Sequence, residues 1–153
     1  MRLKRILVPT DFSKDSALAL KGAIMIAEAT KDSTIFLLHV LPPAVDSVYS
    51  VEENLVELRW DQAKKELAGW KRKVPRKIPC VTLFRKGRAA LVISRVCQEE
   101  SINLIVMTTH GRQGLSRIVH PNASEETVRL APCPVLILPI NRSNLKLKNA
   151  GKN

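Results

Sequence analysis

The chain has 153 residues, of which 45% are hydrophobic and 25% are charged, values typical of one globular domain with a sizeable core. No apolar run reaches the roughly 18 residues that a membrane-spanning helix needs. The charged start, residues 1–5, lacks the hydrophobic region of a signal peptide. We therefore expect a cytoplasmic protein with no membrane partner.

Basic residues outnumber acidic ones by 25 to 14, which gives a formal net charge of +11 at pH 7. Such an excess can mark a nucleic-acid or acidic-membrane partner. Here the cations are dispersed apart from residues 71–77 and 141–153, and no aromatic residues interleave with either cluster for base stacking. The pattern favours a solvated basic surface, and contact with nucleic acid stays as the alternative.

Three cysteines, Cys80, Cys97 and Cys133, are widely spaced and form no CxxC pair. An odd count without paired spacing argues against a disulfide framework and against a zinc site. The sequence predicts three reduced and mostly buried thiols.

Short apolar runs alternate along the chain with segments whose apolar residues recur every three or four positions. The first pattern is typical of buried parallel strands and the second of amphipathic helices. In chain order, the predicted elements are a strand over 5–9, a helix capped by Ser13 that reaches Ala27, a strand over 34–40, a helix over 51–74, a strand over 80–84, a helix that ends near Glu100, a strand over 104–107, a helix from Asn122 to about Leu130, and a strand over 135–140.

Both tryptophans fall in the second predicted helix. Trp60 and Trp70 share one stripe with Ala63, Leu67 and Val74. Aromatic residues on an apolar stripe contribute large buried areas, so we expect core anchors and not a cofactor site.

The alternation of buried strands and helices predicts a parallel sheet with helices on both faces. Ligands of such sheets bind beyond the carboxyl ends of the strands, where the strand order reverses. The fourth strand runs into a glycine-containing loop from Met107 to Arg117, which is weak evidence alone. The segment from Val8 to Ser13, at the end of the first strand, supports it. Together they predict a phosphate-binding site.

Three segments in order resemble the universal stress protein family: Ile6 to Ser13, Asn103 to Arg112, and Val128 to Leu136. The resemblance covers about residues 3–140. It implies a single-domain, five-stranded α/β fold of the adenine-nucleotide alpha-hydrolase-like type, with strand order 3-2-1-4-5. We assign the domain to residues 1–140 and expect a disordered basic tail over 141–153, because the tail cannot bury an apolar face.

The family usually forms homodimers, here through the edge strand from Val135 to Ile140. An apolar edge strand left bare is an aggregation risk, which agrees with pairing between two copies. The alternative is that the tail of the same chain covers this edge.

Family members that bind ATP carry a glycine, two residues, a second glycine, nine residues, then glycine and Ser or Thr. The corresponding positions are Thr108, Gly111, Pro121 and Asn122, so only Gly111 matches. Pro121 has no N–H to donate to a phosphate, and Thr108 adds a side chain where backbone should pass close to the ligand. The helix from Ala123 onward still offers an anion-binding N-terminus. The degenerate motif predicts weak or absent ATP binding.

The resemblance also implies which residues contact an adenine nucleotide, with Mg²⁺ if one is bound. Asp11 would hold the nucleoside, and the backbone of Val40 would bind the base. The alternative is that Asp11 and Gly111 serve only in turns. The full set of expected contacts is Pro9, Thr10, Asp11, Val40, Thr108, His110, Gly111, Arg112, Asn122 and Ala123.

Further charges lie in the same loop. Arg112, Arg117 and His120 could bind a smaller or differently shaped anion. His110 and His39 invite a catalytic interpretation, but no Ser-His-Asp or Cys-His set is visible at a convincing spacing. A lysine placed as in a Walker loop is also missing, so the sequence does not indicate efficient ATP hydrolysis.

The leading hypothesis is a cytoplasmic, dimeric stress-response module that binds or regulates and is not an enzyme. One alternative is an ATP-binding protein with slow ATP hydrolysis, and another is a basic nucleic-acid-associated protein. The sequence does not identify the stress, the pathway or a protein partner.

Overall fold

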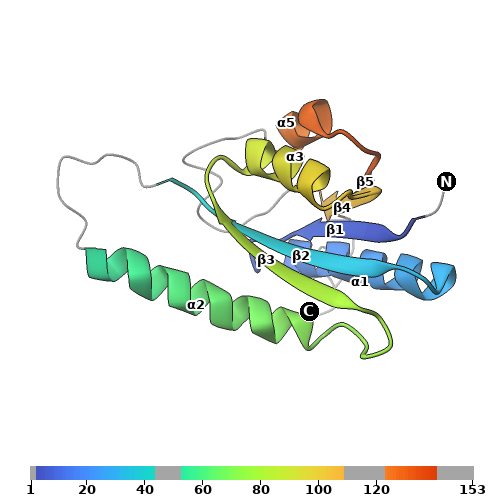
Figure 1. The fold of residues 1–153 in the computed structure, drawn as a ribbon, viewed down its shortest axis with the longest axis horizontal. Coiled ribbons are helices and arrows are strands. Elements are labelled where there is room, and N and C mark those ends of the chain that lie inside the picture. The colour runs from blue at the N-terminus through green and yellow to red at the C-terminus, as the bar shows by residue number, and fades with distance from the viewer. Residues whose placement is uncertain (1–2, 44–52, 109–122, 141–153) are drawn as a thin grey trace, which may run out of the picture.

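The structure is a computed structural model that describes residues 3–43, 53–108 and 123–140. Strands and helices alternate along the chain (Figure 1). The elements are β1 (Arg5–Pro9), α1 (Lys14–Thr30), β2 (Thr34–Leu41), α2 (Glu53–Lys71), β3 (Cys80–Lys86), α3 (Ala89–Glu99), β4 (Leu104–Thr108), α5 (Ala123–Leu130) and β5 (Val135–Leu138).

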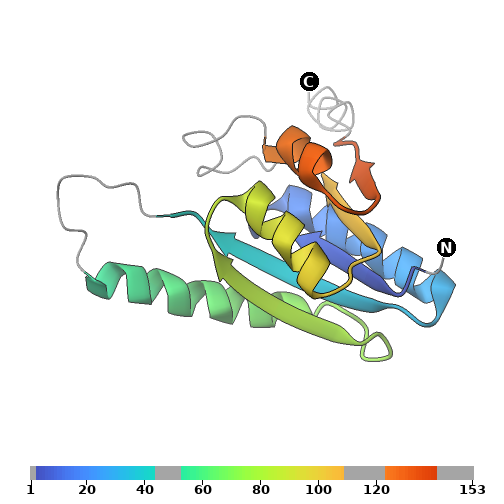
Figure 2. The same cartoon turned by 45° about the horizontal axis from the view of Figure 1, so that its top comes forward.

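All neighbouring strands are parallel, and their order in the sheet is β3-β2-β1-β4-β5. Ile6 of β1 pairs with Ile35 of β2 on one side and with Leu104 of β4 on the other. Helices α1 and α2 lie on one face of the sheet, and α3 and α5 lie on the other (Figures 1 and 2). The predicted fold class and strand order are therefore confirmed.

Successive residues of the central strands point to opposite faces of the sheet. Ile6 and Val8 of β1 pack with the residues of α1 and α2, whereas Leu7 packs with those of α3. Both faces are apolar because a parallel sheet between two helical layers is buried on both sides. Trp70 is buried in the first of these clusters, which confirms its predicted role as a core anchor. Trp60 is half-buried and lies outside both clusters, so it does not anchor the core as predicted.

Several predicted boundaries were wrong by one to a few residues, and two of them have a local cause. Helix α2 ends at Lys71 and not at Val74, because the next turn is tightened by backbone bonds from Lys73 and Val74 to carbonyls three residues before them. Strand β5 ends at Leu138 and not at Ile140. Pro139 follows it, and a proline has no N–H with which to extend the ladder.

The three cysteines are free thiols, as predicted. Cys97 is buried on α3 beside Cys133, and Cys80 and Cys133 are half-buried. Burial, with a smaller contribution from Cys133, raises the pKa of Cys97 to about 12. The Cys97 thiol is therefore protonated at neutral pH and is a poor nucleophile.

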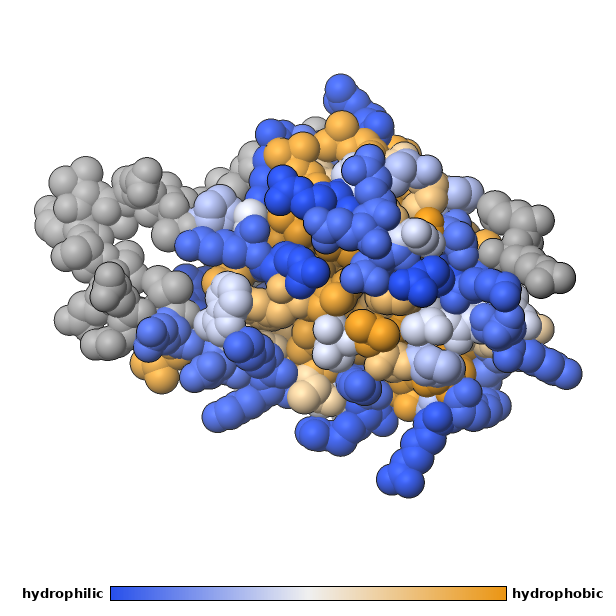
Figure 3. Space-filling view, in the orientation of Figure 1, coloured by the Kyte–Doolittle hydropathy of each residue, from blue (hydrophilic) through white to orange (hydrophobic). Residues whose placement is uncertain are grey.

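Hydrophilic side chains cover much of the face shown in Figure 3, with apolar residues between them. Several cations pair with acids, as Lys4 does with Asp32 and Lys77 with Glu28, at N–O distances of 2.9 and 2.8 Å. No helix in the described ranges is long and apolar enough to cross a membrane. The predicted basic tail, 141–153, lies outside the described residues.

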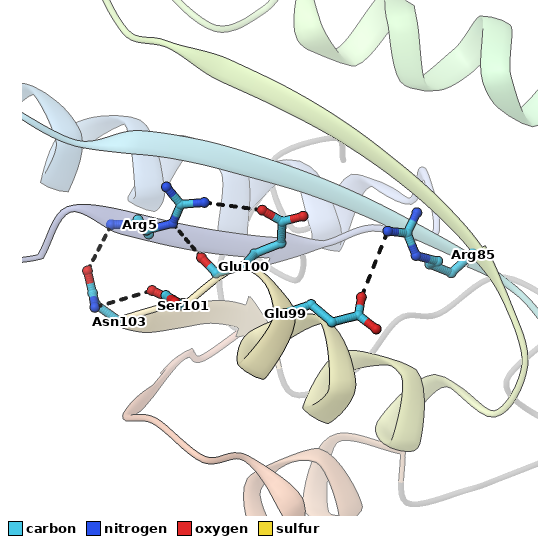
Figure 4. A network of polar contacts seen from close by, with 6 residues as sticks. All are labelled: Arg5, Arg85, Glu99, Glu100, Ser101 and Asn103. Atoms are coloured by element: carbon cyan, nitrogen blue, oxygen red, sulfur yellow. Dashed lines mark hydrogen bonds and ion pairs between the residues drawn. The ribbon is translucent and has the colours of Figure 1, made fainter.

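A polar network joins the starts of β1 and β4 to the end of α3 (Figure 4). Asn103 Oδ1 accepts hydrogen bonds from the backbone N–H groups of Lys4 and Arg5, at 3.0 and 3.1 Å. The Arg5 guanidinium donates to the backbone carbonyl and the carboxylate of Glu100. This network satisfies backbone groups at the amino edge of the sheet, opposite the edge where parallel sheets bind ligands, so its role is structural.

Candidate functional site

The predicted site lies where the order of the strands reverses. The chain leaves β1 through α1 to reach β2, and it leaves β4 through α5 to reach β5 on the other side. The carboxyl ends of β1 and β4 therefore lie side by side with their connections leading apart, which is the position of ligand sites in open α/β sheets. The residues at these ends are Pro9 and Thr108.

The segment after β1 is a tight turn held by its own side chains. The Thr10 N–H donates to the carbonyl of Leu38 in β2 at 2.8 Å. Asp11 Oδ1 accepts from the Ser13 N–H at 3.0 Å and from the Ser16 hydroxyl. Phe12 adopts a φ of +64°, in the left-handed region, and its N–H donates to Thr10 Oγ1. Asp11 is an exposed residue whose carboxylate orders the turn, while its contact with a ligand stays a prediction.

Helix α1 begins directly after this turn. Ser13 is its N-cap, as predicted, and the Ser13 hydroxyl accepts a hydrogen bond from the Ser16 N–H at 3.1 Å. The cap satisfies one of the N–H groups that a helix start leaves without an intrahelical partner. The turn and the helix start therefore form one hydrogen-bonded unit.

Other predicted contact residues also lie at the carboxyl edge of the sheet. Thr10 and Thr108 are buried, and Val40, near the end of β2, is half-buried. Ala123 begins α5, which must run back from this edge to reach the start of the parallel strand β5. The structure thus places Pro9, Thr10, Asp11, Val40, Thr108 and Ala123 at one edge of the sheet. The remaining predicted contacts, His110, Gly111, Arg112 and Asn122, lie outside the described residues, as do Arg117, His120 and Pro121.

Carboxylates lie in the first turn of α5. Glu125 and Glu126 both fall there, and Arg88, the N-cap residue of α3, forms an ion pair with Glu126. Acidic residues suit the positive end of a helix dipole, but they also compete there with a bound anion. The helix start predicted to bind an anion at Ala123 therefore carries two carboxylates, of which Glu126 is paired with Arg88 among the described residues.

The sequence interpretation missed the part that His39 plays beside this turn. His39 Nδ1 lies 2.8 Å from the carbonyl oxygen of Thr10, and its ring stacks on Phe12 with centroids 4.4 Å apart. Burial lowers the pKa of His39, and the hydrogen bond to Thr10 partly opposes this effect. His39 is therefore neutral at pH 7. Its position next to Val40 was the available signal, since neighbouring residues of a strand end share one edge of the sheet.

The described part of the chain contains no group of three or more His, Cys, Asp or Glu residues that could hold a metal ion. The side chains that the structure does bring together are hydrogen-bonding and aromatic groups around a strand end. Such an arrangement can hold a nucleoside, because a ring can stack or pack against apolar surface while carboxylate and backbone groups bind its polar atoms.

The comparisons with known proteins agree on the family and the fold of this chain. Residues 2–139 match the model of the Universal stress protein family. The universal stress protein MJ0531 of Methanocaldococcus jannaschii is 31% identical over 145 residues, which cover 88% of this chain and 81% of that protein.

Two solved structures extend the comparison. The hypothetical protein MJ0577 matches with a TM-score of 0.79 at 25% identity, over 93% of this chain and 99% of that chain. A universal stress protein family protein from Arabidopsis thaliana with AMP bound has a TM-score of 0.64 at 20% identity, over 92% and 94% of the two chains. The likeness to the second structure shows the fold alone. Since the family match spans almost the whole of the described sheet and helices, this chain belongs to the universal stress protein family.

Proposed function

We propose that this protein is a binding or regulatory module, and not an enzyme, that holds an adenine nucleoside or its monophosphate at the carboxyl edge of the sheet. The observation that carries the proposal is the ordered turn after β1, which presents the Asp11 carboxylate at the point where the strand order reverses. A carboxylate at this position can accept hydrogen bonds from ribose hydroxyls. The AMP-bound protein from Arabidopsis thaliana, which has the same fold, gives the ligand class.

The phosphate side of the site supports weak or absent binding of ATP. Thr108 places a buried side chain where the family's ATP binders have glycine, and Pro121 replaces an N–H donor. Glu125 and Glu126 add negative charge at the start of α5. Each additional phosphate would therefore meet fewer donors and more repulsion, so we propose that affinity falls from AMP to ATP.

Calorimetric titration of the nucleotide-stripped protein tests this proposal. We expect saturable binding of adenosine and AMP, weaker binding of ATP with Mg²⁺, and no binding of inorganic phosphate. Asp11→Ala should weaken AMP binding by about tenfold, since it removes a charged acceptor worth roughly 1–2 kcal/mol.

Asp11→Asn is the matched control for that titration, because its amide oxygen can still accept from the Ser13 N–H and keep the turn. If Asp11→Asn keeps the turn but weakens AMP binding as much as Asp11→Ala does, the negative charge of Asp11 contributes to binding the ligand directly and not only through the turn. An absence of saturable heat with both adenosine and AMP would refute the proposed function.

We also propose that the module is a homodimer paired through β5. Within the described sheet β5 is an edge strand, and Leu136 on it is exposed. Pairing with a second copy would cover the open backbone groups of this edge. Sedimentation velocity should show a dimer at micromolar concentration, and Leu136→Lys should shift the population toward monomer by placing charge in the interface. A monomeric parent protein would contradict the proposal. It would favour the alternative that the tail of the same chain covers the edge of β5.

A further inference from the structure

Aromatic side chains are scarce in this protein, yet most of them gather beside the turn after β1. The chain has six Phe, Trp and Tyr residues, and four of them form a continuous group with His39, which we call the ring cluster. The ring cluster consists of Phe12, His39, Trp60, Trp70 and Phe84. It joins the turn, β2, β3 and α2, elements that are far apart in the sequence.

His39 is the central member of the ring cluster. Its ring stacks on Phe12 at 4.4 Å and lies 5.5 Å from the ring of Phe84. Since the Thr10 carbonyl oxygen can only accept, the hydrogen bond of 2.8 Å requires a proton on His39 Nδ1. His39 therefore contacts the turn at two points: it donates a hydrogen bond to the Thr10 carbonyl and stacks on the Phe12 ring.

The turn needs such support because of its backbone conformation. Phe12 has a φ of +64°, which is unfavourable for a bulky residue and persists only where the surroundings enforce it. The Phe12 ring also contacts Trp70 of α2 in an edge-to-face arrangement, with ring centroids 5.9 Å apart. Between Phe12 and Thr10 lies Asp11, so the position of its carboxylate depends on both neighbours.

We propose that His39 is the positioning residue of the nucleotide site: by holding the Thr10 carbonyl and the Phe12 ring, it keeps Asp11 in the conformation that binds the nucleoside. The inference rests on the proposed function for the identity of the ligand. It does not make His39 a ligand contact or a catalytic residue.

A dependence on pH follows from the surroundings of His39. Its ring is packed among Phe12 and Phe84, and the carboxylates of Asp11 and Glu66 face it from the turn and from α2. Burial outweighs these carboxylates and the bond to Thr10, so the pKa of His39 in the closed turn lies below the 6.5 of a free imidazole. A proton therefore binds more tightly to His39 when its bond to Thr10 is broken and its ring is exposed to water. The conformation in which His39 holds the turn is fully favoured above pH 6.5 and loses stability as the pH falls below that value.

Two substitutions separate the hydrogen bond from the ring. His39→Asn places an amide N–H at the position of Nδ1 and removes the titrating ring, whereas His39→Phe keeps a ring and removes the donor. We expect His39→Phe to weaken adenosine binding by about tenfold at pH 7.5, the loss of one well-formed hydrogen bond that fixes the turn. His39→Asn keeps the bond to Thr10 and loses only the ring contacts, so it should weaken binding less, by no more than about threefold.

Adenosine is the probe for the pH series, because it has no phosphate that titrates near pH 6. Its affinity for the parent protein should fall between pH 7.5 and 5.5, and the fall should disappear in His39→Asn. The proposal would be overturned if His39→Phe bound adenosine as tightly as the parent. It would also be overturned if the affinity of His39→Asn fell between pH 7.5 and 5.5 as much as that of the parent. Circular dichroism and urea denaturation check that each variant is folded.

A measurement without nucleotide keeps this inference separate from the proposed function. Amide hydrogen exchange at Phe12 and Ser13, whose N–H groups donate within the turn, should be about tenfold faster in His39→Phe than in His39→Asn at the same pH. If neither adenosine nor AMP binds the parent, the proposed function fails and the exchange rates still decide whether His39 positions the turn. Equal exchange in the two variants would overturn the positioning role.

Discussion

Replacing Phe36 with alanine is expected to lower the free energy of unfolding by about 3–5 kcal/mol, the usual cost of removing a large buried aromatic side chain. Phe36 lies in the middle of β2 and is only 2% exposed. It lies in the hydrophobic cluster on the α3 side of the sheet, which also contains Leu7 and Ile105. The Arg5 guanidinium lies over its ring, 4.6 Å from the centroid, and would lose this cation–π contact as well.

Urea denaturation followed by tryptophan fluorescence measures this change, because Trp60 and Trp70 lie on α2 and report on its packing. Phe36→Leu is the matched variant, and it should cost less than alanine since it leaves a smaller cavity. Leu18→Ala is the surface control: Leu18 is 45% exposed, and its truncation should change the free energy by no more than about 0.5 kcal/mol. Equal midpoints for Phe36→Ala and Leu18→Ala would show that Phe36 does not anchor the core.

Restoring the glycine motif is expected to produce the largest gain in ligand affinity. The triple variant Thr108→Gly, Pro121→Gly and Asn122→Ser should bind ATP at least about tenfold more tightly than the parent, a gain of about 1.4 kcal/mol. Glycine at 108 removes a buried side chain from the strand end, and glycine at 121 supplies an N–H donor near the phosphates. The affinity for adenosine should change little, because Asp11 and Val40 are unaltered.

Calorimetry with ATP and Mg²⁺ measures the gain, with adenosine as the internal reference. Asn122→Ser alone is the control, since it restores the hydroxyl but neither glycine, and we expect it to bind ATP as weakly as the parent. Glycine within a strand costs roughly 0.5–1 kcal/mol of stability, so the variant is checked for folding at the temperature of the titration. An unchanged ATP affinity would show that these positions do not limit phosphate binding.

The two affinity experiments address different halves of one site. Asp11 and His39 act at the turn after β1, which the structure describes fully. Thr108 and Ala123 bracket the loop after β4, whose residues 109–122 lie outside the described part of the chain. Strong binding of a nucleoside together with weak binding of ATP would indicate that the β4 side of the proposed site limits phosphate binding. The triple variant would then test that location directly.

The described residues also separate the site from the elements that stabilise the fold. Asn103 joins β1 to the start of β4, and Arg5 joins β1 to Glu100 at the end of α3 (Figure 4). These contacts lie at the amino edge of the sheet, opposite the carboxyl ends where the site is predicted. Variants at the amino edge should therefore change stability without changing nucleotide affinity. In contrast, Asp11 orders the turn and is also a proposed ligand contact, so its substitution should change both stability and nucleotide affinity.

Much of this fold is determined by local patterns in the sequence. The continuous apolar run of Ile6, Leu7 and Val8 predicts a strand that is buried on both faces, and five such runs separated by helical periodicity leave few topologies. Ser13 marked the start of α1 because a hydroxyl can satisfy the first free N–H groups of a helix. The order β3-β2-β1-β4-β5 itself came from the resemblance carried by three motifs, and the structure confirms it.

Other boundaries depended on partners that are distant in the sequence. Strand β3 continues through Arg85 and Lys86, beyond the apolar run, because β2 pairs with it as far as Leu41. Polar residues are tolerated there since β3 is an edge strand of the sheet. A pattern of hydrophobicity carries no information on how far a neighbouring strand extends.

The sequence by itself therefore determined the family and the layered α/β architecture, and it predicted the edge of the sheet for the site, because each follows from local patterning or from contiguous motifs. Only the tertiary structure placed His39 against Thr10 and Phe12, and Arg88 against Glu126. These contacts join residues 27 to 38 positions apart, and their geometry is set by strand register and helix packing. Side chains that act across such distances have no sequence spacing of their own, so the support of the candidate site became visible only in the folded protein.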